Sequence, residues 1–195
     1  MTDVQTVLGR AVSIVGRHTV YWAGAGGFDP QADSPVQPLA IGQQWPSQTQ
    51  EDQAIFRPLA EAAGLNVDDP KLVAPACDCS GFVCWALGIS RHPNLHTWIN
   101  TDTIWDDANG RSVQFRRIER AVVGCIVVYP TVEGHKYGHI ALVTEIDANG
   151  RATRIVHCSA DNFGSAPPDA IKITGPKAFE AQSESIYAWF LGMKA

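Results

Sequence analysis

The second half of the chain is dominated by short apolar runs with the length and composition of β-strands. Four such runs cover residues 125–129, 139–146, 153–157 and 185–190, and they are rich in branched and aromatic side chains. Asn149-Gly150 lies between the second and the third run, and this dipeptide is typical of a tight hairpin turn. The first half carries helical patterns instead. We therefore predict an α+β fold in which N-terminal helices pack on a C-terminal antiparallel sheet.

Helical signals occur in three places along the first half. Apolar residues recur at helical spacing after a capping pair, which predicts a first helix from about residue 4 to 16. A second helix is expected over 51–63, with Pro58 as an internal kink or break. The third covers 79–87 and ends at Gly88, because glycine is favoured just after the last helical turn.

Length and charge limit the classes of function. A chain of 195 residues can bury a core without metal or disulfide links, so we expect a single domain over residues 1–195. Residues 28–75 are rich in Pro, Gln, Asp and Ser and are expected to form an extended insertion of loop and helix. The net charge is −5 with scattered basic residues, which argues against nucleic acid as a partner. No apolar run approaches the roughly 18 residues that span a bilayer, so no membrane partner is predicted.

Cys79 is the strongest candidate nucleophile, since it begins the helix predicted at 79–87. Unpaired N–H groups and the helix dipole favour negative charge at that position. A thiol there is expected to have a pKa below its ordinary value of about 8.5, which would populate the nucleophilic thiolate. Gly81, in the same first turn, would allow another segment or a substrate to approach closely.

Two histidines supply the groups that a cysteine nucleophile needs. His139 opens one predicted strand, and His157 closes the next one after the Asn149-Gly150 turn. If these strands pair in antiparallel fashion, the start of one lies beside the end of the other. The spacing therefore predicts His139 as the general base for Cys79 and His157 as the residue that orients it.

The segment Asp78-Cys79-Ser80-Gly81-Phe82, the Gly138-His139 strand and the Val156-His157 strand end resemble the NlpC-type cell-wall cysteine peptidases. This family is a branch of the papain-like fold. The upstream Tyr21-Trp22 with Gly26-Gly27 is similar to the tyrosine and glycine motif that precedes the nucleophile in the family. The four motifs occur in the family's order over about residues 18–160.

The resemblance implies a papain-like hydrolase in which Cys79, His139 and His157 are catalytic. It also implies that Tyr21, Asp78 and Ser80 help to hold the free amino end of the substrate. That substrate would be a peptidoglycan stem peptide, commonly cut between D-glutamate and the diamino acid, without metal or other cofactor. One departure is Gly124-Cys125, where the family usually has Gly-Asp before the strand that carries the base.

Several alternatives stay open for the cysteines. Cys77 is the nearest rival nucleophile, although it precedes the predicted helix and lacks the favourable dipole. Cys84 and Cys158 are predicted to be packing residues. The group Cys77, Cys79, Cys84, His92 and His96 also permits a zinc-stapled module without catalysis, or a cell-wall binder with a degenerate site.

The scissile bond and the compartment also have alternatives. A related activity is N-acetylmuramoyl-L-alanine amidase, which cuts between the sugar and the stem peptide, or a related acyl transfer. Residues 1–16 lack a basic stretch followed by an apolar run, so we expect synthesis in the cytoplasm without a signal peptide. Action in the cell wall or periplasm then requires a non-classical route. We favour an injected antibacterial effector, which would need an immunity protein in the producing cell.

Overall fold

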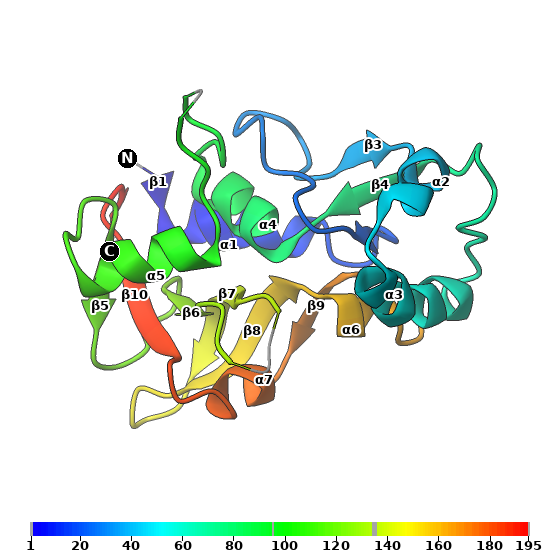
Figure 1. The fold of residues 1–195 in the computed structure, drawn as a ribbon. Helices are drawn as coiled ribbons and strands as arrows, with labels where there is room; N and C mark the ends of the chain where they lie inside the picture. Colours follow the sequence, from blue (N-terminus) through cyan, green and yellow to red (C-terminus); the bar gives the residue numbers. More distant parts are fainter. Residues whose placement is uncertain (1, 95, 134–135, 195) are drawn as a thin grey trace.

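The structure is a computed structural model that describes residues 2–94, 96–133 and 136–194. Its centre is a six-stranded antiparallel sheet with strand order β5-β10-β6-β7-β8-β9. Helices α1, α4 and α5 lie on one face of this sheet and α7 lies on the other (Figure 1). The strands of the central sheet are β5 (Phe115–Ile118), β6 (Ile126–Tyr129), β7 (His139–Ile146), β8 (Ala152–Cys158), β9 (Ile171–Thr174) and β10 (Ile186–Phe190). The predicted α+β fold is confirmed.

The predicted hairpin forms as expected from its turn. Strands β7 and β8 pair in antiparallel register, with Leu142 opposite Val156. Gly150 adopts a positive φ of 73°, and the Asp147 carboxylate accepts the N–H groups of Asn149 and Arg151. The turn chemistry therefore sets the register that brings the start of β7 beside the end of β8.

Strand β6, near the middle of the sheet, is buried on both faces because helices cover each side. Alternate residues of β6 enter different cores: Ile126 and Val128 pack under the large helices, while Val127 and Tyr129 pack in a smaller cluster around Phe179 of α7. Both faces of the strand are apolar for this reason, and the strands form continuous apolar runs in the sequence.

The large face carries three helices, of which the first two agree with predicted segments apart from their ends, whereas the third was not predicted. They are α1 (Val4–Ser13), α4 (Cys79–Leu87) and α5 (Thr101–Asn109). The predicted third helix matches α4, which ends at Gly88 in the left-handed conformation. The first helix stops three residues earlier than expected, because Ile14 already has non-helical ψ. No helix among the described residues is long and apolar enough to span a bilayer.

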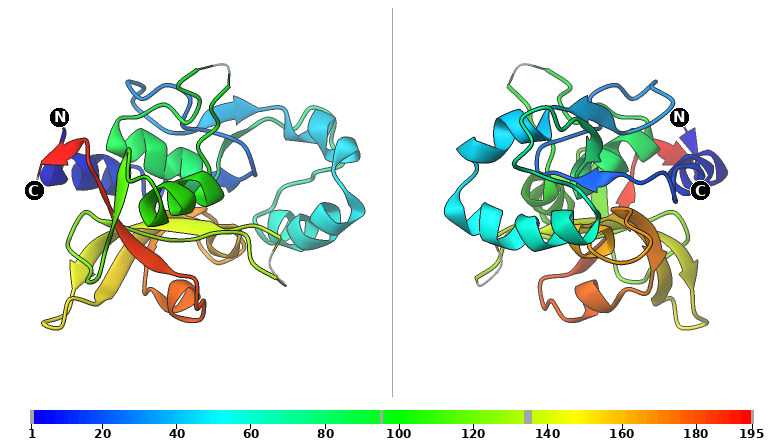
Figure 2. Two further views of the ribbon diagram at one scale, coloured as in Figure 1. Left: turned by 60° about the vertical axis from the view of Figure 1, so that its left-hand side comes forward. Right: turned by 90° about the vertical axis from the view of Figure 1, so that its right-hand side faces the viewer.

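Residues 28–75 form an arm beside the sheet that is plain in both views of Figure 2. The arm contains α3 (Gln50–Ala62), which runs through Pro58 as one helix, so the predicted break there is wrong. Near the two ends of the arm, β3 and β4 pair with each other, and β4 also pairs with β2, which precedes the arm. Together they form a three-stranded sheet of order β2-β4-β3. The remaining elements are β1 (Thr2–Asp3), β2 (Val20–Tyr21), β3 (Gln37–Leu39), α2 (Ile41–Gln44), a 3-10 turn (Trp45–Ser47), β4 (Ala74–Cys77), α6 (Ala160–Phe163), α7 (Lys177–Glu180) and β11 (Met193–Lys194).

Candidate active site

Cys79 is the first residue of α4, where Asp78 caps the helix. The Asp78 carboxylate accepts the backbone N–H of Gly81 at 2.7 Å and that of Gly24 at 2.6 Å. The first bond satisfies an N–H that has no partner within the helix, and the second ties the aromatic-glycine turn to the cap. The sulfur therefore projects from a helix end that is fixed by the residue before it.

Arg91 anchors this cap from the loop after α4. Its guanidinium forms a two-pronged ion pair with Asp78, at 2.9 and 3.0 Å, and both side chains are buried. It also donates to the Ser80 hydroxyl and to the carbonyl of Ala25. Trp98 covers the guanidinium at 4.3 Å from its ring centroid. This buried network immobilises the start of α4.

Gly81 is required by a close approach of backbone to backbone. A Cβ at this position would lie 2.6 Å from the carbonyl oxygen of Ala25 and 2.7 Å from that of Gly26. The segment expected to approach Gly81 is therefore the upstream aromatic-glycine turn. That contact explains why a glycine turn and a helix-start glycine occur together in this sequence.

His139 and His157 meet at the open end of the β7–β8 hairpin. The Nε2 atom of His139 lies 2.7 Å from the Nδ1 atom of His157. The imidazole of His139 also stacks on Phe179, with ring centroids 5.2 Å apart. Since Nε2 of His139 is occupied by its neighbour, Nδ1 is the nitrogen left to serve a thiol.

The Cys79 sulfur lies against the start of β7. The backbone N–H groups of Ser80 and Ile140 are directed at it, and Ile140 immediately follows His139. The Tyr21 side chain also lies close enough to the Cys79 side chain for that thiol to contribute to raising the pKa of Tyr21, after burial. No hydrogen bond joins Cys79 to His139 in the part of the chain that the structure describes, so the two are brought together through the backbone of Ile140.

Burial governs the protonation of these groups. Burial, followed by the nearby Asp78 charge, raises the pKa of the Cys79 thiol, whereas Arg91 and the two N–H groups lower it. The expected lowering of this pKa at a helix start is therefore outweighed by burial. Burial also lowers the pKa of His139, with a smaller contribution from His157, and lowers that of His157 to about 4. The resting pair is a thiol and a neutral imidazole, in which His139 is free to accept a proton.

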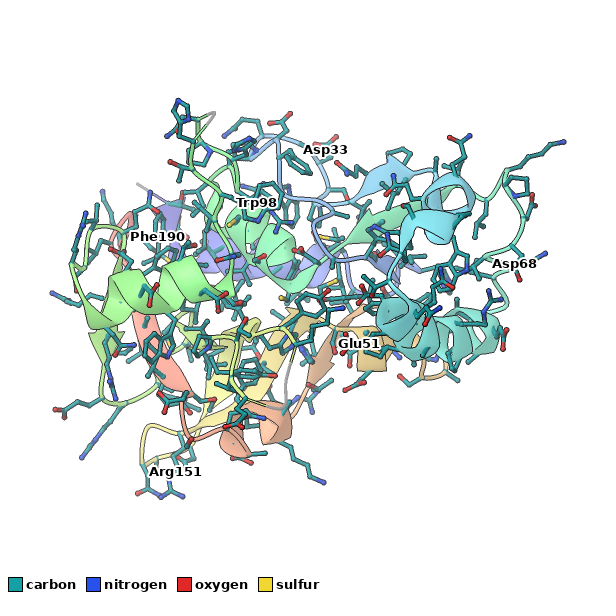
Figure 3. All side chains as sticks on the ribbon, in the orientation of Figure 1. Asp33, Glu51, Asp68, Trp98, Arg151 and Phe190 are labelled. Atoms are coloured by element: carbon teal, nitrogen blue, oxygen red, sulfur yellow. The ribbon has the colours of Figure 1, made fainter. Side chains whose placement is uncertain are left out.

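Two cavities adjoin the Cys79 and His139 positions and share Tyr21, Tyr137 and Gly138 as lining residues. The smaller, of 190 Å³, is lined by Cys79, Arg91, Trp98 and Asp102 among others. The larger, of 550 Å³, is lined by both histidines and by Glu51, Ile55 and Phe56 of α3. Figure 3 labels one residue from each wall, Trp98 of the smaller cavity and Glu51, on α3, of the larger one. The reacting groups thus face space on two sides.

The geometry is that of a cysteine hydrolase, and a family comparison agrees with it. Residues 70–159 match the CHAP domain. This domain comprises cysteine- and histidine-dependent amidohydrolases and peptidases of the papain-like fold. The matched segment contains Cys79, His139 and His157. No curated protein matches the chain.

The CHAP match confirms the resemblance to papain-like cell-wall hydrolases. It gives the activity as peptidoglycan hydrolysis by an amidase or a peptidase. CHAP domains act on peptidoglycan. The NlpC-type branch and the bond that is cut remain predictions.

The three residues predicted to hold the substrate differ in accessibility. Asp78 and Ser80 are buried, and every oxygen of the Asp78 carboxylate already accepts hydrogen bonds from the protein. Tyr21 is partly exposed and lines both cavities. All three line the smaller cavity, and of the three Tyr21 also lines the larger one.

The remaining cysteines lie in the core. Cys77, Cys84, Cys125 and Cys158 are buried free thiols, and Cys77 directs its Sγ to the backbone carbonyl of Asp78. Cys125, which replaces the family's aspartate, packs in the small core near Phe179. No cluster of three or more metal-binding side chains occurs within the described ranges.

Four contacts around the candidate site are not predictable from the sequence patterns. Arg91 lies in a loop without a local pattern, and nothing in its neighbourhood indicates a partner 13 residues earlier. Thr174 and Asn162 contact His157 from β9 and α6, which were not predicted. Lys136 joins the arm to the β6–β7 connection through Asp52, at 3.0 Å. Each depends on tertiary contacts between distant segments.

Proposed function

We propose that this protein is a cysteine endopeptidase that cuts peptidoglycan stem peptides, at the bond between D-glutamate and the diamino acid. The observation that carries the proposal is the pairing of His139 and His157 at 2.7 Å beside the strand residue whose N–H faces the Cys79 sulfur. These are the nucleophile, base and orienting group of a thiol hydrolase.

The proposed reaction begins with a neutral pair. His139 accepts the Cys79 proton at Nδ1 while the sulfur forms a bond to the substrate carbonyl carbon. The backbone N–H of Cys79, at the first position of α4, and the Tyr21 hydroxyl are placed to stabilise the oxyanion. Breakage of the C–N bond passes the proton from His139 to the leaving amine. A water molecule, deprotonated by His139, then releases the acyl group and restores the thiol.

The shape of the cleft supports an internal peptide bond as the target. Space extends from the reacting groups both toward Trp98 and toward α3, so a peptide can continue on each side of the bond. We propose that the arm at 28–75 acts as a groove wall, since Ile55 and Phe56 present apolar surface to the larger cavity. A groove of this kind fits a peptide better than a single terminal group.

Mass spectrometry of purified peptidoglycan digested with the wild type tests the scissile bond, with Cys79→Ala as the blank. The endopeptidase predicts new amino termini on the diamino acid and stem remnants that end in glutamate. Complete stem peptides, freed from the sugar, would instead establish the amidase that the CHAP match also allows. Products of transfer to an added amine would indicate acyl transfer.

We also propose that the protein acts in the periplasm after injection into a competing cell. The motivation is the proposed substrate, because peptidoglycan lies outside the cytoplasm. Expression with an added export signal should lyse a bacterial host, whereas unmodified expression and exported Cys79→Ala should not. Lysis by the unmodified protein would contradict the requirement for delivery. A neighbouring gene for a small exported protein that blocks lysis would supply the immunity partner.

A further inference from the structure

A histidine in the orienting position raises a question of tautomers. A neutral imidazole has one nitrogen that donates and one that accepts. For His139 to keep a bare Nδ1 for the thiol, its proton must sit on Nε2 and be accepted by Nδ1 of His157, 2.7 Å away. His157 must then carry its own proton on Nε2. The reverse tautomer of His157 would donate to His139 and place the His139 proton on the catalytic nitrogen.

Thr174 offers the acceptor that the productive tautomer needs. Its Oγ1 lies 2.9 Å from Nε2 of His157. The same hydroxyl donates to the backbone carbonyl of Gly175 at 3.1 Å. Since a hydroxyl has one proton, donation to Gly175 leaves Thr174 as an acceptor toward His157. The contacts thus form a directed chain from His139 through His157 and Thr174 to a backbone carbonyl.

Asn162 is the competing neighbour of His157. Its Nδ2 atom lies 3.2 Å from Nε2 of His157 and, as a donor, would favour the unproductive tautomer. The amide protons have other acceptors, however: the carbonyl of Ala170 at 3.1 Å and that of His157 at 3.5 Å. Asn162 can therefore satisfy both amide protons without donating to the His157 ring. The contact with Thr174 then determines the tautomer of His157.

We propose that Thr174 is a positioning residue that holds His157 in the Nε2–H tautomer and so keeps Nδ1 of His139 available to the Cys79 thiol. The proposal rests on the proposed roles of these three residues. It assigns a fourth residue, on a separate strand and outside the segment that matches the CHAP domain.

Three variants test the proposal. Thr174→Val removes the hydroxyl at nearly constant volume, and Thr174→Ser retains it. Thr144→Val is the matched control, because it makes the same change on β7 at a hydroxyl that has no hydrogen-bond partner among the residues that the structure describes. We expect Thr174→Val to lower kcat on peptidoglycan about ten- to hundred-fold, the effect of losing one buried partner, with little change in KM. Thr174→Ser and Thr144→Val should stay within about threefold of the wild type.

A second readout does not depend on the substrate. Nitrogen-15 NMR of the imidazoles should show His157 protonated at Nε2 in the wild type and in Thr174→Ser. In Thr174→Val it should show a shift toward Nδ1. The rate of Cys79 alkylation should fall in parallel in Thr174→Val. An Nδ1–H tautomer in the wild type, or an unchanged tautomer in Thr174→Val, would overturn the proposal even if the enzyme cuts the expected bond. A wrong bond with the expected tautomers would overturn the proposed function alone.

Discussion

The nucleophile and the histidines are held in place by two different kinds of structure. At the start of α4, Asp78 and Arg91 form a buried ion pair. Further hydrogen bonds from the Gly81 N–H to Asp78 and from Arg91 to Ser80 hold the first turn of the helix in place. At the end of the β7–β8 hairpin, His139 and His157 form a chain of single hydrogen bonds that borders an open cavity. We therefore expect the start of α4 to contribute most to the stability of the fold. We expect the end of the β7–β8 hairpin to control the reactivity of the Cys79 thiol.

The largest effect is expected at the histidine end, from His139→Gln. This change removes the base, and general-base catalysis contributes about a hundred- to ten-thousand-fold to rate. The free energy of unfolding should change by only about 1 kcal/mol, because His139 is partly exposed and borders a cavity. Fragment release from peptidoglycan and urea unfolding measure the two quantities. A large loss of stability with intact activity would contradict the assignment of reactivity to the histidine pair and of stability to the start of α4.

The next effect is expected at the nucleophile end, from Arg91→Leu. Loss of one partner leaves the Asp78 carboxylate buried and uncompensated, which costs about 3–5 kcal/mol of unfolding free energy. Arg57→Leu is the control, since Arg57 pairs with Asp68 at the surface at 2.7 Å and surface pairs contribute much less to stability than a buried pair. Equal losses in the two variants, measured by urea unfolding, would show that the buried network does not stabilise the helix start.

The pH dependence of activity tests the protonation of His139. Burial and His157 lower the pKa of His139 below 6.5, so His139 should stay an effective base in mildly acidic solution. The acid limb of kcat/KM against pH should therefore lie below 6.5, with about a tenfold loss per pH unit beneath it. His157→Asn removes one cause of the lowering and should move this limb upward. An acid limb at or above 6.5 in the wild type would contradict the account.

The same lowered pKa values predict an effect on stability. In the unfolded chain His139 and His157 bind protons near the ordinary histidine pKa of 6.5, whereas folded His157 does so only near a pKa of about 4. The unfolded state therefore binds more protons between these values, and the free energy of unfolding should fall as the pH drops from about 6.5 toward 4. Urea unfolding at a series of pH values measures this slope, and a flat profile over this range would argue against burial of the two rings.

The smallest effect is expected where the arm meets the β6–β7 connection. Lys136 bonds to Asp52 of α3 at 3.0 Å, and the Tyr137 hydroxyl contacts the same carboxylate at 3.3 Å. Lys136→Met should loosen the groove wall and raise KM by about two- to fivefold, with kcat nearly unchanged, because a partly exposed pair contributes about 1 kcal/mol or less. Lys71→Met, on the exposed part of the arm, is the control. A lower kcat with an unchanged KM would place Lys136 in the chemistry instead.

The elements that the sequence predicts well depend on local signals. Asp78 and Gly88 mark the two ends of α4, and the Asn149-Gly150 turn sets the pairing that joins His139 to His157. The rest depends on distant parts of the chain. Arg91 meets Asp78 only after the loop beyond α4 folds back, and Thr174 meets His157 only through the pairing of β8 and β9.

The protonation of Cys79 could not be predicted from the sequence either. A helix start lowers the pKa of a thiol, and this is what the motif predicts. The opposing effect, burial of the sulfur beneath Tyr21 and β7, exists only in the folded structure and is the larger of the two. The position of Cys79 in its motif therefore predicts a nucleophile without determining the resting protonation of the thiol.

The most direct test of the central claim compares Cys79→Ala with Cys77→Ala in the release of soluble fragments from purified peptidoglycan. The two residues are buried cysteines two positions apart, so each variant controls for the loss of a thiol at the other position. The account predicts that Cys77→Ala retains most of the wild-type activity, whereas Cys79→Ala releases no more than the enzyme-free blank. Full activity in Cys79→Ala would contradict it.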